Sequence, residues 1–141
     1  MLFDPNNYSV VFLSYDEPNA ETNWKHLQRI HPDSMRMHGV KGSDTAHKEC
    51  AKISLTPNVI IIDGDNMIRP DFFQQTWEID DSIDLNKCTL SWSGKNTVNG
   101  TSYGNGSVKC WPVEIIKNMR THENSEDPRY NVDFDCNNYL Q

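Results

Sequence analysis

Short apolar segments alternate with amphipathic ones over the first 62 residues, and this alternation constrains the fold more than any other feature. The apolar segments are residues 8–13, which are β-branched and aromatic, 35–40, where apolar and polar residues alternate, and 59–62, which are apolar throughout. Segments of this length and composition are typical of strands. The sequence therefore predicts three strands in the first half of the chain.

Two helices are predicted between these strands. Apolar side chains recur at helical spacing at Trp24, Leu27 and Ile30, and a second amphipathic segment begins after residues 42–44, which offer an N-cap. Strands and helices that alternate in this way form a parallel sheet covered by helices. We therefore expect an α/β fold with a mostly parallel central sheet that is flanked by helices.

A polar segment rich in acidic residues follows each predicted strand. These segments are residues 14–17, 41–44 and 63–66. In sheets of this class, ligands bind beyond the carboxyl ends of the strands. We therefore expect the three segments to converge on one binding edge of the sheet.

The second half of the chain has less regular patterns. In chain order they predict a helix at 70–77, a strand at 88–93, a loop and hairpin region at 94–106, a helix at 111–119, an exposed loop at 120–131 and the beginning of a helix at 133–140.

Composition and charge exclude several classes of protein. With 13 Lys and Arg against 20 Asp and Glu, the net charge is −7, which argues against bulk nucleic-acid binding because that affinity comes from cationic groups. The longest aliphatic run, 59–62, is far shorter than the ~20 residues of a membrane span, and the N-terminal residues lack the basic and apolar regions of a signal peptide. We expect no membrane segment, a cytoplasmic location and free cysteine thiols.

Asp63 and Asp65 form the most informative pair of residues. They follow the apolar strand at 59–62 and are separated by Gly64. In an extended chain, residues i and i+2 point the same way, so the two carboxylates can share one target. Such oxygen ligands suit Mg²⁺ or Mn²⁺. The alternative is a turn whose carboxylates cap the next helix.

The same segment resembles a known family. Residues 62–66 (IDGDN) and Pro70-Asp71 are similar to the D-x-D region of GT-A fold glycosyltransferases, especially the family-2 type. Four other segments resemble family segments in the expected order: 10–17 (first nucleotide-binding strand and loop), 41–48 (helix start near the donor diphosphate), 103–111 (glycine-rich segment before the acceptor-side helix) and 132–135 (segment of the catalytic base).

The similarity covers residues 8–136, so it implies a single GT-A domain over residues 1–141. The nucleotide-binding half would be at about 8–70 and the acceptor-side half at about 71–141. Residues 15–19 (YDEPN) and 91–96 (SWSGKN) also resemble short glycosyltransferase-like proteins of tailed phages. This second resemblance implies a location in the host cytoplasm.

The resemblance implies a nucleotide-sugar donor, which we expect to be UDP-linked, and a Mn²⁺ or Mg²⁺ cofactor. It assigns Asp65 to the metal and Asp63 to the metal or the ribose. The other residues for which it implies donor contacts are Ser14, Tyr15, Asp16, Glu17, Lys41, Asp44, His47, Lys48 and Gly64. A turn with a helix cap is the alternative for Asp16 and Glu17, and a solvated helix face for His47 and Lys48.

On the acceptor side, the resemblance implies a general base at Asp133, with Asp135 second. Val132 stands where the family has a glutamate, and Glu126-Asp127 offers a rival base. The resemblance also implies a metal ligand at His122. Because aromatic rings stack on sugar faces and these residues flank polar loops, we expect acceptor contacts at Trp92 and Tyr103, and also at Asn105. The alternatives are a helix cap for Asp133, a solvated loop for His122 and core packing for Trp92.

The expected function is the transfer of a sugar from the donor to a hydroxyl acceptor, with inversion by analogy to the family. The acceptor could be a glycan, a protein, a small molecule or a modified nucleobase. The chain ends near the last acidic motif, so a catalytically idle nucleotide-sugar or carbohydrate-binding module, or a fragment of a larger transferase, is the alternative. A nucleotidyltransferase would also use paired carboxylates, but it wants a glycine-rich and basic loop where this chain has residues 15–18.

Overall fold

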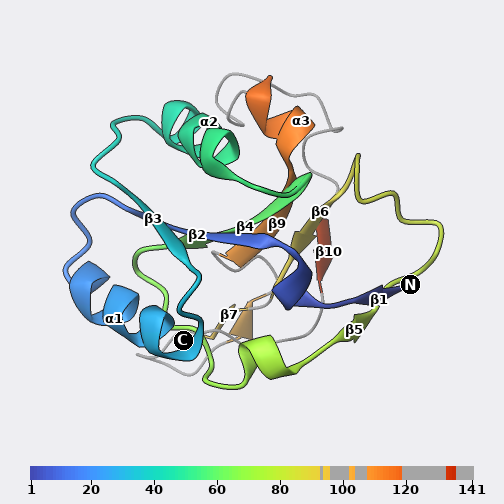
Figure 1. Cartoon of the computed structure of the whole chain (residues 1–141), viewed down its shortest axis with the longest axis horizontal. Helices are drawn as coiled ribbons and strands as arrows, with labels where there is room; N and C mark the ends of the chain where they lie inside the picture. The colour runs from blue at the N-terminus through green and yellow to red at the C-terminus, as the bar shows by residue number, and fades with distance from the viewer. Residues whose placement is uncertain (93, 96–101, 104–107, 119–132, 136–141) are drawn as a thin grey trace.

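A six-stranded sheet lies at the centre of the computed structural model, which describes residues 1–92, 94–95, 102–103, 108–118 and 133–135 (Figure 1). The strand order is β10-β6-β9-β4-β2-β3. In chain order these strands are β2 (Ser9–Ser14), β3 (Met35–His38), β4 (Asn58–Asp63), β6 (Thr89–Ser91), β9 (Val108–Pro112) and β10 (Asp133–Asp135).

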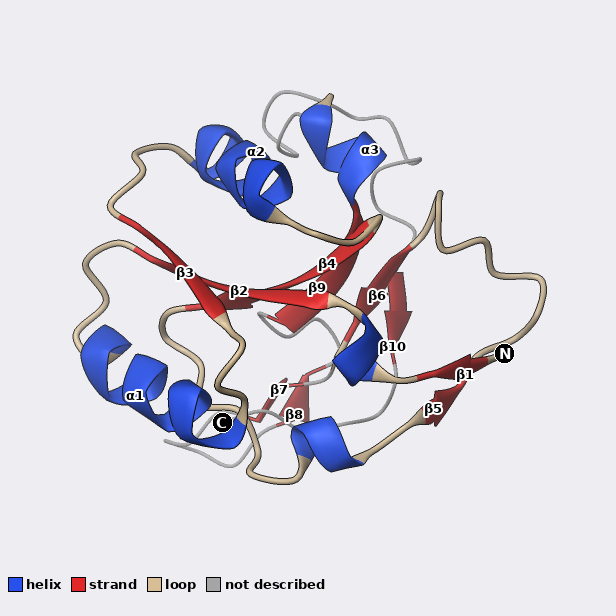
Figure 2. Ribbon diagram, in the orientation of Figure 1, coloured by secondary structure: helices blue, strands red, loops and turns tan. Residues whose placement is uncertain are grey.

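Helices cover both faces of this sheet. Figure 2 shows α1 (Ala20–Ile30) on one face, and α2 (Ser43–Ile53) and α3 (Val113–Lys117) on the other. The smaller elements are two single turns of 3-10 helix, η1 (Pro5–Asn7) and η2 (Phe72–Gln74), and two antiparallel pairs, β1 (Leu2–Phe3) with β5 (Trp77–Glu78) and β7 (Gly94–Lys95) with β8 (Ser102–Tyr103). No helix in the described part of the chain is long and apolar enough to span a bilayer.

The strand directions confirm an α/β fold and show that its sheet is mixed. The expected order of strands and helices over residues 8–63 is confirmed, and β2 pairs in parallel with both β3 and β4. Strand β9 is antiparallel to both of its neighbours, β4 and β6, whereas the other five strands run in one direction. Strands β6 and β9 are neighbours in the sheet and are connected through residues 92–107.

Three helices predicted in the second half are wrong in whole or in part. Residues 70–77 form only η2 before β5 begins, because Trp77 is extended and pairs with Phe3 of β1, while the side chains of Phe72 and Phe73 are buried in the core. Residues 108–112 are strand β9, so the helix expected at 111–119 begins only at Val113. Residues 133–135 are strand β10 rather than the beginning of a helix. The hairpin expected within 94–106 is confirmed by β7 and β8, and residues 120–131 lie outside the described residues.

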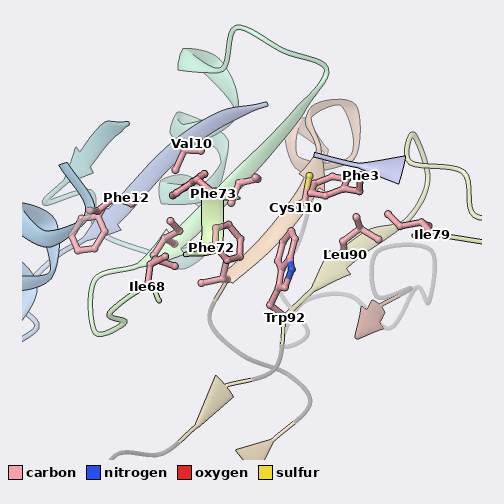
Figure 3. Close-up of a cluster of buried hydrophobic side chains, with 14 residues drawn as sticks. Phe3, Val10, Phe12, Ile68, Phe72, Phe73, Ile79, Leu90, Trp92 and Cys110 are labelled. Atoms are coloured by element: carbon pink, nitrogen blue, oxygen red, sulfur yellow. The ribbon is translucent and has the colours of Figure 1, made fainter. Parts of the chain in front are cut away.

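Strand β4 is buried from both faces and divides the core in two. Ile60 and Ile62 pack on the α1 side, in the cluster drawn in Figure 3. Val59 and Ile61 pack on the other side, against α2 and α3. Each of these four side chains is at most 2% exposed. Strand β4 therefore fixes both layers of helices relative to the sheet.

Replacing Ile60 by alanine should lower the free energy of unfolding by about 2–5 kcal/mol, because it removes a fully buried side chain and leaves a cavity between β4 and α1. Urea denaturation measures this loss. Leu55→Ala is the matched control, since the Leu55 side chain is 87% exposed, and it should change stability by no more than about 0.5 kcal/mol. Equal effects of the two substitutions would contradict this account of the core.

Candidate functional site

A pocket of about 400 Å³ lies at the carboxyl ends of β2, β3 and β4, against the first turns of α2. The three polar segments that the sequence places at this edge do converge there. Its walls come from the end of β2 and the loop after it, the loop between β3 and α2 with the first turns of that helix, and the turn after β4. The lining residues are Leu13, Ser14, Tyr15, Glu17, Val40, Lys41, Gly42, Ser43, Ala46, His47, Asp63 and Asp65.

The turn after β4 lies directly against the end of β2. The amide of Gly64 donates to the carbonyl of Leu13 at 2.8 Å, and the amide of Asn66 donates to the carbonyl of Asp63 at 3.0 Å. A Cβ atom on Gly64 would lie 2.7 Å from Oε1 of Glu17 and 3.0 Å from Cβ of Ser14. A side chain at this position would force Glu17 and Ser14 to shift, so Gly64 favours the close approach of the two loops.

Asp63 and Asp65 both line the pocket, although residues 63–66 form a turn and not the extended chain on which the i, i+2 argument rested. Asp63 is half-buried at the end of β4, whereas Asp65 is exposed and accepts a hydrogen bond from Nδ2 of Asn66 at 2.9 Å. Among the described residues, no three His, Cys, Asp or Glu side chains are grouped closely enough to hold a metal ion by themselves. Mg²⁺ typically takes one or two carboxylates and completes its shell with water and substrate phosphates. The donor set therefore fits such an ion bound together with a phosphorylated ligand.

The loop after β2 contributes a carboxylate and an aromatic ring. Oε1 of Glu17 accepts a hydrogen bond from the amide of Tyr15 at 2.7 Å, which folds the loop back on itself. The ring of Tyr15 is 49% exposed at the rim of the pocket. An aromatic ring in this position offers a flat surface for a nucleobase or a sugar.

The N-terminal end of α2 forms the opposite wall. Gly42 has φ +91°, a left-handed conformation that starts the helix at Ser43. Lys41 lies just before this turn and also lines the pocket. Free backbone amides and the helix dipole make such an end favourable for anions. Lys41 adds a positive charge to this wall, while Asp44 in the first turn of α2 adds a negative one.

His47, one turn into α2, is held at two points. The carbonyl of Ser43 can only accept, so Nδ1 of His47 donates to it at 2.8 Å and the neutral ring keeps its lone pair on Nε2. The indole of Trp111 packs edge-on against the ring, with centroids 5.7 Å apart. Burial lowers the pKa of His47 below 6.5, as does the nearby charge of Lys109, while Ser43 and Asp44 act in the opposite direction.

The structure brings most of the expected donor residues together. Ser14, Tyr15, Glu17, Lys41, His47, Asp63 and Asp65 line the pocket. Asp16, Asp44, Lys48 and Gly64 do not line it, and one carboxylate oxygen of Asp44 is buried without a hydrogen-bond partner. Leu13, Val40 and Ala46 form an apolar part of the wall that was not predicted from the sequence. The signal for Leu13 and Val40 was their place at the ends of predicted strands.

The expected acceptor residues fare differently. The prediction for Trp92 is wrong, because its side chain is fully buried beside Phe3 and Phe72 (Figure 3) and cannot stack on a sugar there. The ring of Trp77 also packs against it, with centroids 5.5 Å apart. The backbone of Tyr103 lies in β8, paired with Gly94. Asn105 and His122 lie outside the described residues.

The two expected bases lie on a strand of the same sheet. The backbone of Asp133 pairs with Thr89, and that of Asp135 pairs with Ser91, in the parallel pair of β10 with β6. Strand β10 runs in the same direction as β4, and the register through β6 and β9 places Asp135 level with Ile61, two residues before Asp63. Three strand spacings separate strand β10 from strand β4, about 14 Å at ~4.8 Å per step.

Comparison with known proteins gives no match. No protein-family model matches the sequence, and no curated protein or solved structure matches the chain.

Gly64→Ala should lower the free energy of unfolding by about 1–3 kcal/mol, because the new methyl group overlaps the positions of Glu17 and Ser14. Urea denaturation measures the loss. Glu17→Ala in the Gly64→Ala background should restore part of it, since the carboxylate of Glu17 is the nearest obstacle. A Gly64→Ala protein as stable as the wild type would contradict the close approach of the two loops.

Because the pKa of His47 is lowered in the folded chain, the free energy of unfolding should decrease as the pH is lowered. Below about pH 6.5 the unfolded chain takes up a proton at this histidine, whereas the folded chain resists it until the pH reaches the lower folded pKa. The contribution of His47 to stability is therefore fully present above about pH 6.5, and it is lost as the pH falls from there toward the folded pKa. Urea denaturation at pH 7.5 and pH 5.5 should show a smaller loss in His47→Gln than in the wild type.

Burial also lowers the pKa of His31, so His47→Gln should keep a residual pH dependence and His31→Gln should keep the part that His47 contributes. An identical loss between pH 7.5 and pH 5.5 in His47→Gln and the wild type would overturn the assignment.

Proposed function

We propose that this chain is a metal-dependent glycosyltransferase of the GT-A type that binds a nucleotide-sugar donor in the pocket at the ends of β2, β3 and β4. One observation carries the proposal: Asp63 and Asp65 line the same pocket as Lys41 and the first turn of α2. Paired carboxylates that face an electropositive helix end suit a divalent ion and a diphosphate bound together. The place of the pocket in the α/β sheet also agrees with nucleotide binding.

Five of the six strands run in one direction, with β9 reversed between β4 and β6. Because β2, β3 and β4 end at the same edge, the three loops after them meet there. This arrangement supports a nucleotide-binding α/β architecture, and the GT-A assignment within that class rests on the sequence resemblance.

The two carboxylates would hold Mg²⁺ or Mn²⁺ through Asp65, with Asp63 toward the ion or the ribose. The bound ion would supply Lewis-acid stabilisation of the charge that develops on the leaving diphosphate. Lys41 and the amides at the N-terminus of α2 lie on the opposite wall, so they would bind the diphosphate oxygens from that side.

The rest of the pocket suits a nucleoside. Leu13, Val40 and Ala46 provide an apolar surface, and Tyr15 adds an exposed ring at the rim. Bases and riboses bind in clefts of this kind, in which a mainly apolar wall carries a few placed polar groups. Ser14, Glu17 and His47 are the polar groups available here.

The general base would come from β10. Strand β10 lies three strand spacings from β4, and Asp135 is level with Ile61, so Asp135 is too far from Asp63 for the two to share one metal ion but lies toward the same end of the sheet. This separation suits a division of roles, with the donor held at β4 and the acceptor hydroxyl deprotonated at β10. Asp133 stays the first candidate by its motif, and transfer with inversion follows from the family resemblance.

Thermal unfolding with UDP-, GDP-, CMP- and dTDP-sugars, each with Mn²⁺, Mg²⁺ or EDTA, tests the donor site. One class of nucleotide should raise the midpoint only when a divalent ion is present. At 100 times its Kd, a ligand adds about 2.7 kcal/mol of stability, which corresponds to roughly 5 °C or more for a chain of this size. The shift should disappear in Asp65→Asn.

Asp33→Asn is the matched control, because Asp33 is exposed just before β3, at the opposite edge of the sheet. It should keep the full shift. The absence of a shift with every nucleotide in a folded sample would overturn the donor site. Donor binding without any turnover, equal in the wild type and Asp133→Asn, would instead indicate the idle binding module.

A further inference from the structure

Arg36 does not line the pocket, yet its side chain contacts residues on both sides of the loop 15–19, which supplies two of the pocket-lining side chains. Nε of Arg36 donates to Oγ of Ser14, the residue just before the loop, at 3.0 Å. Nη2 of Arg36 donates to Oε1 of Glu21, in the first turn of α1 just after the loop, at 2.6 Å. One guanidinium group therefore bridges the two ends of the loop.

The position of this guanidinium is itself well defined. The side chain of Arg36 is only 18% exposed, and its guanidinium carbon lies 5.9 Å from the ring centroids of both Phe12 and Trp24. Cation–π contacts with these two adjacent rings and charge-assisted hydrogen bonds leave it little freedom. His38 completes the group, since its Nδ1 lies 2.8 Å from Oγ of Ser14 and 3.3 Å from Nη2 of Arg36.

The first turn of α1 also contacts the turn after β4, which carries Asp65. Nδ2 of Asn23 donates to the carbonyl of Gly64 at 3.0 Å, and Asn23 is only 5% exposed. Gly64 in turn lies against Ser14 and Glu17. The start of α1 is thus linked to the loop after β2 through Glu21 and Arg36, and to the turn after β4 through Asn23.

We propose that Arg36 is a positioning residue for this pocket: it holds the loop 15–19 in the conformation that places Glu17 against Gly64, beside Asp63 and Asp65. The planar guanidinium of Arg36 donates hydrogen bonds to Ser14 and Glu21 at the same time. A lysine ammonium, at the end of a flexible stem, would hold this pair of hydrogen bonds less firmly. The consequence for the donor rests on the proposed function, so the test measures the loop and the ligand separately.

The first measurement is amide hydrogen exchange by NMR in Arg36→Met, without ligand. The reporters are the amides of Tyr15, which donates to Glu17, and Gly39, which donates to the carbonyl of Ser14. Their exchange should become about tenfold faster, the scale of one lost charged hydrogen bond, while the amides of Ile60 and Ile62 stay protected. Arg36→Lys should give an intermediate rate, and this partial rescue distinguishes positioning from mere loss of packing.

Lys52→Met is the matched control, because it removes a cation that pairs with Glu49 on the exposed face of α2. It should leave the exchange of Tyr15 and Gly39 unchanged. If Arg36→Met does not fold, Glu21→Gln decides, since the Glu21 side chain is 68% exposed and its loss removes only one anchor. Loop exchange equal to wild type in the folded variants would overturn the positioning role, whether or not any nucleotide binds.

The second measurement is the Kd of the nucleotide that stabilises the wild type. It should rise about tenfold in Arg36→Met and less in Arg36→Lys. Faster loop exchange with an unchanged Kd would overturn the role of Arg36 in donor binding. Faster loop exchange in a protein that binds no nucleotide even as wild type would support the contact between Arg36 and the loop and would overturn the proposed function alone.

Discussion

The burial of β4 from both faces is the constraint on which the rest of the structure depends. Ile60 and Ile62 pack toward α1, while Val59 and Ile61 pack toward α2 and α3. Because β4 is hydrogen-bonded to β2 on one side and to β9 on the other, it fixes both halves of the sheet. Asp63 ends this strand, so the first carboxylate of the pocket is held by a strand that is packed on both faces.

The pocket depends on how closely the turns after β2 and β4 approach each other. Gly64 permits that approach, since any larger residue would meet Ser14 and Glu17. Polar contacts behind the pocket then keep the two turns in place: Arg36 links Ser14 to α1, and Asn23 links α1 to the carbonyl of Gly64. Most of these side chains are buried or half-buried, where a hydrogen bond is costly to lose. The pocket-lining residues are thus positioned by Arg36, Glu21 and Asn23, which do not themselves line the pocket.

Sequence reasoning succeeded where a local pattern and its packing agree, and it failed where packing decided alone. The strands at 8–13, 35–40 and 59–62 and the two helices between them carry their own periodicity. Residues 111–119 look amphipathic in a helix, but Trp111 belongs to β9, which is buried between β4 and β6. Trp92 lies next to a polar loop in the sequence, yet the rings of Phe3, Phe72 and Trp77 enclose it, so its neighbour along the chain was a poor guide to its surroundings.

The sequence by itself determined the α/β class, the two carboxylates after a buried strand and the edge at which three polar loops meet, because hydrophobic periodicity and the direction of parallel strands follow from local pattern. Only the tertiary structure decided the reversed direction of β9, the apolar wall of Leu13, Val40 and Ala46, and the reach of Arg36 from β3 to Ser14 and Glu21. These features join residues that are distant in the chain, and they depend on which faces must be buried together rather than on any segment's own preference.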